Sequence, residues 1–267
     1  MGAMLSFVIP VRHQENARDW NRVKENLSQT VASISGQTHS SWDAVIVANH
    51  GATLPSLPAP FTVCRVDFPP NQLHEQGESN LDTFRNAFRF DKGRRVLAGM
   101  LHLTPTGFIM ICDDDDLVHR HLAAYVDDNP YENGWYVGDG WVWEDGERLL
   151  YKESNLHLIC GTSHIIRSDL YNIPRSLEAA SDEYLCRMLG SHLMINDELA
   201  RQGFILKRLP FSGAIYRIGH PEAHSRSTGL SGRYFQSKNP LKIMKSLSRL
   251  RLKTTRLERD YFGAKQI

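Results

Sequence analysis

Apolar residues in the first half of the chain recur in a strand–helix order. Apolar residues at helical spacing predict a helix over 19–35, and 92–103 is expected to be helical as well. Short apolar runs predict strands at 5–11, 42–48, 61–68 and 108–112. The run at 108–112 has little polar alternation, which is typical of a strand buried on both faces. This order, with short connections, predicts a mostly parallel sheet covered by helices on both faces.

The second half of the chain has a different pattern. Residues 134–150 are rich in Trp, Tyr, Gly and Val and predict antiparallel strands around a turn at Asp145-Gly146. Further strands are expected within 156–167 and 204–218, and a helix across 182–202. We therefore expect an α/β fold in which the parallel sheet is joined to a smaller antiparallel region.

Four consecutive aspartates, Asp113–Asp116, follow the last apolar run of the first half. Adjacent carboxylates repel one another, and a divalent cation such as Mg²⁺ or Mn²⁺ removes that repulsion. The alternative is an acidic loop that caps a helix starting near Leu117, but capping accounts for one or two acids rather than four. Because ligands bind beyond the carboxyl ends of parallel strands, we expect the aspartates to converge with His13 and with Asn49-His50-Gly51.

Composition and charge narrow the class of protein. The 267 residues are 41% hydrophobic and 23% charged, as in an ordinary globular protein, and no apolar run approaches the length of a membrane span. The first residues do not resemble a signal segment, and the four cysteines are scattered without a Cys-x-x-Cys pair. We therefore expect a cytoplasmic protein with reduced thiols and no structural zinc.

The C-terminal residues are strongly basic. Residues 226–267 hold eleven Lys/Arg and two Asp/Glu, whereas the remainder holds 20 Lys/Arg and 28 Asp/Glu. We expect a helix to start at Asn239-Pro240, with Leu241, Met244, Leu247, Leu250, Leu257 and Tyr261 on one face. Such a helix either lies on an anionic membrane surface, which would place the protein at the inner face of the membrane, or packs on the acidic body or on a second subunit of a homo-oligomer. We therefore divide the chain into a catalytic domain at 4–230 and a basic amphipathic tail at 231–267.

The order of these parts over about residues 5–226 resembles family 2 glycosyltransferases of the GT-A fold. The segments that carry the resemblance are Val8-Ile9-Pro10-Val11-Arg12, the helix end Ser35-Gly36-Gln37-Thr38, the D-x-D-D-L match at Asp113–Leu117, and 211–225 with Tyr216-Arg217 and His220. The resemblance implies metal-dependent transfer of a sugar from a nucleoside-diphosphate sugar, with UDP-sugars favoured. The acceptor would be a hydroxyl of a glycan or glycolipid, in the synthesis of a cell-surface polysaccharide.

The resemblance also implies roles for particular residues. Asp113 and Asp115 would hold Mn²⁺ or Mg²⁺, and His220 or His224 would complete the metal shell or touch the diphosphate. Asp113 and Asp114 would contact the donor, and the nucleoside pocket would be lined by Pro10, Val11 and Arg12. Basic residues at the start of the helix expected from Lys92 would add phosphate contacts, namely Lys92, Arg94 and Arg95, or would simply be solvated.

Two positions depart from the family pattern. Asn49 and His50 stand where the family has acids, one of which reads the nucleobase, although an amide or imidazole can still hydrogen-bond a uracil edge. Ser191-His192 replaces the usual catalytic acid pair, so His192 is the candidate base for the acceptor hydroxyl, unless it only satisfies a local helix contact. Asp116 is the second catalytic candidate, and the remaining acids that could act as the base are Asp182, Asp197 and Glu198.

The acceptor is expected to meet the second half of the chain. One of four aromatic residues would stack on a sugar while the others are core, namely Trp135, Tyr136, Trp141 and Trp143. Residues 160–164 would form the floor of the acceptor site, because Gly161 permits close approach.

Two other functions stay open at this point. A sugar nucleotidyltransferase would also use carboxylate-bound Mg²⁺, although no Gly-rich phosphate loop follows the first strand. A catalytically degenerate relative, acting as a binding or assembly subunit, is favoured by the Ser191-His192 replacement. Nucleic acid is not an expected partner, because the body of the protein is acidic.

Overall fold

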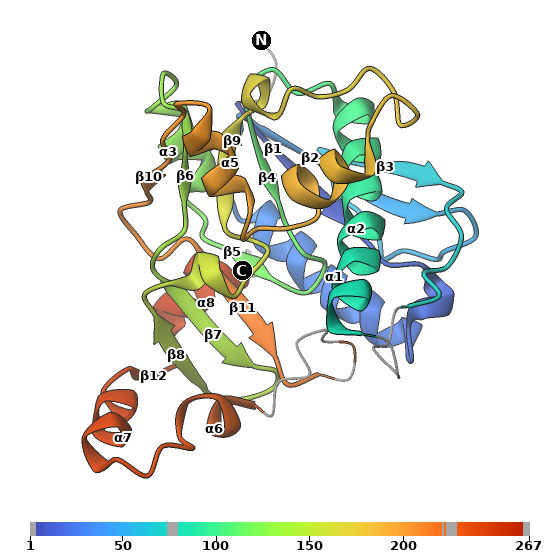
Figure 1. The fold of residues 1–267 in the computed structure, drawn as a ribbon. Coiled ribbons are helices and arrows are strands. Elements are labelled where there is room, and N and C mark those ends of the chain that lie inside the picture. The colour runs from blue at the N-terminus through green and yellow to red at the C-terminus, as the bar shows by residue number, and fades with distance from the viewer. Residues whose placement is uncertain (1–3, 74–79, 221, 223–228, 264–267) are drawn as a thin grey trace.

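The computed structural model describes residues 4–73, 80–220, 222 and 229–263, and it confirms the α/β fold (Figure 1). The strands are β1 (Leu5–Pro10), β2 (Trp42–Asn49), β3 (Phe61–Val66), β4 (Phe108–Ile111), β5 (Leu117–Val118), β6 (Gly134–Tyr136), β7 (Gly140–Glu144), β8 (Leu149–Glu153), β9 (His164–Arg167), β10 (Lys207–Arg208), β11 (Ala214–Ile218) and β12 (Leu250–Leu252). The α-helices are α1 (Trp20–Ser35), α2 (Leu81–Leu103), α3 (Leu122–Asp127), α4 (Asp182–Tyr184), α5 (Ile195–Arg201), α6 (Gly229–Tyr234), α7 (Pro240–Leu247) and α8 (Thr255–Tyr261). Short 3₁₀ turns cover Gln14–Asn16, Leu156–Leu158 and Ser168–Tyr171, and a π-helical turn covers Leu185–Leu189.

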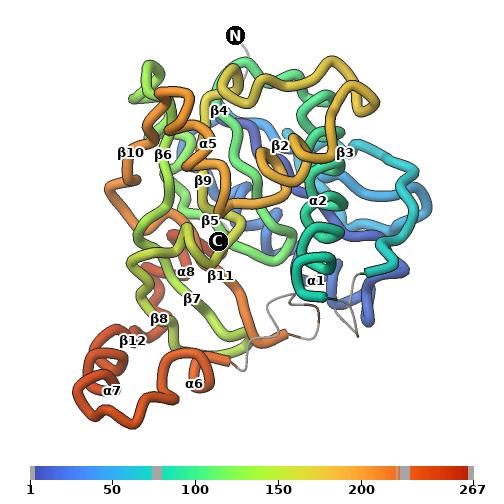
Figure 2. Tube along the Cα trace, viewed as in Figure 1, coloured from blue at the N-terminus to red at the C-terminus, as the bar shows by residue number. Residues whose placement is uncertain are grey.

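The large sheet is mostly parallel, as the sequence predicts. Its strand order is β10-β6-β9-β4-β1-β2-β3, and only β9 runs antiparallel to its neighbours. β1 lies between β2 and β4, with Leu5 opposite both Trp42 and Phe108. The carboxyl ends of these three strands therefore lie at one edge of the sheet, where the trace continues into the loops that follow them (Figure 2).

Both faces of the large sheet are buried at its central strands β1, β2 and β4. Every residue of β1 is buried, and alternate side chains belong to different hydrophobic clusters. Phe7 packs in the cluster that contains Leu27 of α1, whereas Val8 packs in the cluster that contains Val96 and Met100 of α2. The absence of polar alternation in the sequence thus has the expected cause, because helices cover the sheet on both sides.

A second, smaller sheet follows the order β12-β8-β7-β11-β5. Its pairings are antiparallel except that β7 and β11 run parallel. β6, which lies in the segment expected to form this antiparallel region, pairs with β9 and β10 in the large sheet instead. The loop between β4 and β5, which contains the four aspartates, connects the two sheets and lies where they meet.

Three further expectations, on elements between residues 80 and 202, are wrong. α2 begins at Leu81 rather than near Lys92, because the Asn80 side chain accepts a hydrogen bond from the Asp82 backbone N–H and caps the helix. The helix expected over 182–202 is broken into α4, the π-helical turn and α5. Only the end of the strand region expected at 156–167 is a strand, since β9 starts at His164.

The basic tail does not form one continuous helix. α7 starts at Asn239-Pro240 as predicted, but it ends at Leu247, and the chain then pairs with β8 through β12. α8 follows, and its Tyr261 is buried among residues of the small sheet. Among the described residues, no helix has both the length and the apolar character needed to cross a membrane.

Candidate functional site

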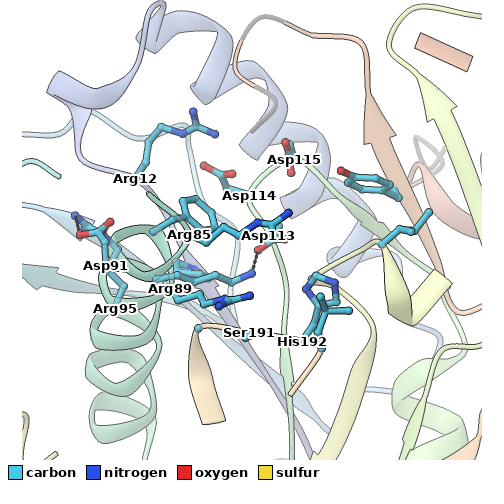
Figure 3. Close-up of a pocket in the computed structure, with 18 of the residues that line it drawn as sticks. Arg12, Arg85, Arg89, Asp91, Arg95, Asp113, Asp114, Asp115, Ser191 and His192 are labelled. Carbon is cyan, nitrogen blue, oxygen red and sulfur yellow. Dashed lines mark hydrogen bonds and ion pairs between the residues drawn. The ribbon is translucent and has the colours of Figure 1, made fainter. Parts of the chain in front are cut away.

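A cavity of about 460 Å³ lies beyond the carboxyl ends of β1 and β4. One wall comes from the first turns of α2, and another from the aspartate loop. The remaining lining comes from residues 158–161, from the turn at 190–193, from Tyr216 and Arg217 of β11, and from Arg233 of α6. Figure 3 shows Arg85 and Arg89 projecting from α2 toward the aspartates. His192 lies on the side of the cavity opposite α2. The cavity is therefore built from both sheets, from α2 and from the segments that connect them.

Asp113 faces the cavity and forms an ion pair with Lys92 of α2. The Asp113 backbone N–H donates a hydrogen bond of 2.9 Å to Thr162 Oγ1, which fixes the loop against the strand that follows. Burial acts to lower the pKa of Lys92, but the charge and hydrogen bond of Asp113 outweigh burial and raise it. Lys92 therefore stays a cation at neutral pH, held beside this carboxylate.

Asp114 and Asp115 also line the cavity, in different electrostatic settings. Asp115 Oδ2 lies 2.9 Å from His220 Nε2. Burial acts to raise the pKa of Asp115, but the hydrogen bond and charge of His220, together with Arg12 and Arg217, outweigh burial and lower it. Burial raises the pKa of Asp114 to about 7, against the nearby Arg12 charge.

Asp116 does not line the cavity. Its side chain is fully buried, and its Oδ2 accepts hydrogen bonds from Thr162 Oγ1 at 2.6 Å and Cys160 Sγ at 3.2 Å. Its Oδ1 accepts a hydrogen bond of 3.1 Å from the Arg217 backbone N–H. Burial raises the pKa of Asp116 well above its usual range. The residue thus joins the aspartate loop to residues 160–162 and to β11.

The aspartates supply oxygen ligands but do not form a complete metal site by themselves. Among the residues that the structure describes, no group of three or more His, Cys, Asp or Glu is placed to hold a metal ion alone. Asp113 and Asp115 nevertheless present hard carboxylate oxygens to the same cavity, and Mg²⁺ is commonly held by one or two carboxylates plus substrate phosphates. His220 lies beside Asp115 with 6% of its surface exposed, whereas His224 lies outside the described residues.

The residues expected in the nucleoside pocket are only partly brought together. Pro10 and Arg12 line the cavity, and Arg12 is paired with Glu222 at 3.3 Å. Val11 is fully buried in the core. His13 is buried and accepts a hydrogen bond from the Glu15 backbone N–H, and it is not among the lining residues.

Asn49 and His50, at the end of β2, lie in different environments. The Asn49 side chain is buried, accepts a hydrogen bond of 2.7 Å from Arg95 Nη1 and donates one of 2.6 Å to the Phe68 carbonyl. Arg95 lines the cavity, although it is 1% exposed and is also paired with Asp91 at 3.0 Å. His50 is exposed and does not line the cavity. Asn49 thus holds an arginine in place rather than facing the cavity.

Ser191 and His192 lie in the turn between the π-helical turn and α5, and both line the cavity. Burial, reinforced by the Lys92 charge, lowers the pKa of His192 to about 4. The imidazole is therefore neutral at neutral pH and can accept a hydrogen bond, but a pKa of about 4 makes it a weak base. The other acids considered for this role, Asp182, Asp197 and Glu198, are not among the residues that line this cavity.

The sequence did not reveal the aromatic and basic residues at the start of α2. Phe84 and Phe88, and likewise Arg85 and Arg89, are spaced by four residues and line the cavity. That spacing, after the capping Asn80, is the signal that could have found them. The aromatic residues expected to reach a sugar, Trp135, Tyr136, Trp141 and Trp143, do not line this cavity, whereas Gly161 does.

Comparison with known proteins finds similarity to solved structures only. No protein-family model matches this chain, and no curated protein matches it either. One crystal structure of S. aureus TarS is similar with a TM-score of 0.37 and 12% identity, covering 82% of this chain and 37% of that chain. A crystal structure of S. aureus TarS 1–349 is similar with a TM-score of 0.39 and 12% identity, covering 81% of this chain and 60% of that chain. The chain spans less than two thirds of either TarS chain.

Proposed function

We propose that the protein transfers a sugar from a nucleoside-diphosphate sugar, with UDP-sugars favoured, to a hydroxyl of a glycan or glycolipid acceptor. The acceptor would belong to a cell-surface polysaccharide under synthesis. The observation that carries the proposal is the cavity at the carboxyl ends of β1 and β4, where Asp113 and Asp115 face cationic side chains. Carboxylates that hold a cation, with Lys92 and Arg12 beside them, suit a diphosphate. The family resemblance of the same aspartate loop supports the same chemistry.

Asp113 and Asp115 are the residues that would hold Mn²⁺ or Mg²⁺, with His220 beside them. A bound ion of this kind stabilises the negative charge that builds on a departing diphosphate. Lys92, kept charged by Asp113, would contact the same phosphates. Asp116 would act as a positioning residue, since it holds residues 160–162 and β11 in place from outside the cavity.

His192 is the candidate general base. Its imidazole is neutral at neutral pH and would accept a hydrogen bond from the acceptor hydroxyl. With a pKa of about 4 it is a weak base, so it would take that proton only as the oxygen bonds to the anomeric carbon and the hydroxyl becomes strongly acidic. The nucleoside diphosphate leaves with the bonding electron pair of the anomeric carbon. Ser191, adjacent in the same turn, also lines the cavity and would hydrogen-bond the acceptor.

Turnover of nucleotide sugars tests the proposal. We expect the purified protein to release nucleoside diphosphate from one of a panel of UDP-, GDP- and CDP-sugars in the presence of Mn²⁺, even slowly and with water as acceptor. EDTA should abolish release. The substitution Asp115→Asn should lower the rate by a factor of about 100 or more, because it removes a charged metal ligand. Asp169→Asn, at an exposed aspartate outside the cavity, is the matched control.

Three results would contradict the proposal. No release from any sugar nucleotide would favour a binding or assembly subunit. Pyrophosphate release from a nucleoside triphosphate and a sugar phosphate would identify a sugar nucleotidyltransferase. Full activity of Asp115→Asn would remove the proposed metal site.

The second part of the proposal concerns the membrane. We propose that α7 contacts an anionic membrane surface, which would place the protein at the inner face of the membrane beside a lipid-linked acceptor. Leu241, Met244 and Leu247 of α7 are 73%, 65% and 53% exposed, and the residues from 223 to 257 include no Asp or Glu. α7 follows α6, whose Arg233 lines the cavity. A membrane contact there would bring a lipid-linked acceptor close to the site.

A further inference from the structure

The cavity holds more cations than carboxylates. Of its lining residues, seven are Arg or Lys and four are Asp, so the excess is three positive charges (7 − 4 = 3). The cationic side chains are those of Arg12, Arg85, Arg89, Lys92, Arg95, Arg217 and Arg233. A cation-rich, partly enclosed site concentrates the field on an anionic ligand.

The seven cations fall into two groups. Four have a carboxylate oxygen within 4.0 Å in the protein, in the pairs Arg12–Glu222, Lys92–Asp113, Arg95–Asp91 and Arg217–Asp145. Arg85, Arg89 and Arg233 form no ion pair with any described residue. Arg89 Nη1 donates to Asn86 Oδ1 at 3.3 Å, and the Arg233 guanidinium lies 5.7 Å from the Tyr234 ring centroid. Three guanidinium charges at the cavity are thus not neutralised by described carboxylates.

Arg85 and Arg89 line the cavity from the first turns of α2. They are one turn apart on α2, and Lys92 follows one turn later on the same face, beside Asp113. Gly190 packs so tightly on the Arg89 backbone carbonyl that a Cβ at this position would collide with it. Arg89 is therefore directly adjacent to the turn that carries Ser191 and His192, the candidate acceptor-binding residues.

We propose that Arg85 and Arg89 form a subsite for a phosphate group of the acceptor, either a phosphodiester of a glycan chain or the phosphate of a lipid-linked glycan. The inference rests on the proposed function, in which the aspartates and Lys92 bind the donor. The first turns of α2, which precede Lys92, are then left to bind the acceptor. Arginine suits this role, since its guanidinium binds phosphate oxygens with two parallel hydrogen bonds. An uncharged acceptor would offer neither arginine an anionic partner.

A two-step calorimetric titration tests the subsite. The protein is first saturated with UDP and Mn²⁺, and glycerol 1-phosphate is then added as the probe of the acceptor phosphate. We expect the double variant Arg85→Gln/Arg89→Gln to bind the probe about tenfold or more weaker than the unchanged protein, while its UDP affinity stays within about twofold. Arg256→Gln, at an exposed arginine outside the cavity, should change neither affinity. Thermal melting of each variant confirms that it is folded.

Several results would overturn the inference. One is a probe affinity unchanged in the double variant, and another is absence of probe binding to the unchanged protein. A UDP affinity that falls as much as the probe affinity would assign the arginines to the donor diphosphate. If UDP does not bind the unchanged protein, the proposed donor site fails, and the probe is titrated alone. Loss of probe binding in the double variant would then still support the subsite.

Where the subsite is confirmed, two probes separate the sources of the phosphate. Short polyol-phosphate oligomers carry phosphodiesters, and a short-chain isoprenyl phosphate carries a lipid phosphate. The source is identified by the probe that competes with glycerol 1-phosphate for the unchanged protein and does not bind the double variant. Competition by neither would contradict an acceptor phosphate of these two kinds.

Discussion

Gly161 lies against the pair formed by Asp113 and Lys92. A Cβ at this position would collide with Asp113 Oδ2 and would lie 2.6 Å from Lys92 Nζ. Both atoms are the ends of flexible side chains, so a methyl group would displace them rather than the backbone. The cost of Gly161→Ala should therefore appear in binding more than in stability.

We predict that Gly161→Ala lowers the affinity for UDP with Mn²⁺ by about tenfold, with a melting temperature close to that of the unchanged protein. Calorimetry and thermal melting provide the two readouts. Gly203→Ala is the control: open space surrounds Gly203, but its φ is +88°, so alanine there costs stability without touching the cavity. Unchanged nucleotide affinity in Gly161→Ala would contradict the assignment of Asp113 and Lys92.

Buried histidines should make the fold sensitive to mild acid. Burial lowers the pKa of His119 and His192 to about 4 and that of His164 to about 3. A histidine in the unfolded chain keeps a pKa of about 6.5. Between about pH 6.5 and 4 the unfolded chain therefore binds protons that the folded chain does not. Above about pH 6.5 these histidines do not lower the free energy of unfolding. As the pH falls from about 6.5 to 4, they lower it progressively.

Urea denaturation at about pH 7.5 and about pH 5 measures this effect. We predict that His164→Gln loses less unfolding free energy between the two pH values than the unchanged protein, because glutamine does not titrate. His50→Gln, at an exposed histidine, should retain the full loss. An identical loss in the unchanged protein and in His164→Gln would contradict the prediction.

At the scale of elements, α2 has two functions along its length. Its C-terminal turns pack Val96 and Met100 under the large sheet, and its first turns carry Arg85, Arg89 and Lys92 into the cavity. The sheet therefore fixes the helix, and the helix positions the cationic side chains. This coupling explains how basic residues gather beside the aspartates although they are far apart in the sequence.

The sequence predicts best the strands that are buried on both faces. β1, β2 and β4 are of this kind, so each is a continuous apolar run that can be recognised in the sequence. The first turns of α2 face the cavity rather than the core, and their polar and aromatic residues do not show the usual apolar periodicity. The sequence placed Asn49 and His50 at a strand end, but only tertiary contacts decide that Asn49 binds Arg95 and that His50 faces solvent.

α7 is the element for which membrane contact is predicted. It projects from the small-sheet end of the molecule in Figures 1 and 2, and β12 anchors its far end to β8. Its exposed apolar residues alternate with Lys242 and Lys245, an arrangement that suits the interface of an anionic bilayer. The remaining apolar residues of the tail are used differently, since Tyr261 is buried in the small sheet.

We predict that the protein sediments with phosphatidylcholine vesicles that contain phosphatidylglycerol, and not with pure phosphatidylcholine vesicles, at low salt. The triple variant Leu241→Ser/Met244→Ser/Leu247→Ser should bind about tenfold or more weakly, since it removes the apolar contact. Tyr131→Ser/Ile205→Ser is the matched control, because these side chains are 95% and 64% exposed elsewhere. Equal binding by the triple variant, or a dimer in solution that the triple variant dissociates, would contradict membrane contact.

At the scale of the whole molecule, the aspartate loop joins the two sheets. Asp113 and Asp115 line the cavity, while Asp116 holds β11 of the small sheet through the Arg217 backbone. The small sheet is completed by β12 from the basic tail. The acidic residues that would bind the metal and the basic residues that would face the membrane thus belong to one connected structure.

Calorimetric titration of UDP, GDP and CDP, each with Mn²⁺ and with EDTA, tests the central claim most directly. The proposed donor site predicts binding of one nucleoside diphosphate, UDP in the first place, that requires Mn²⁺ and is lost in Asp115→Asn. Binding of none of the three nucleotides, or binding that is equally strong in EDTA, would contradict a metal-dependent donor site at Asp113 and Asp115.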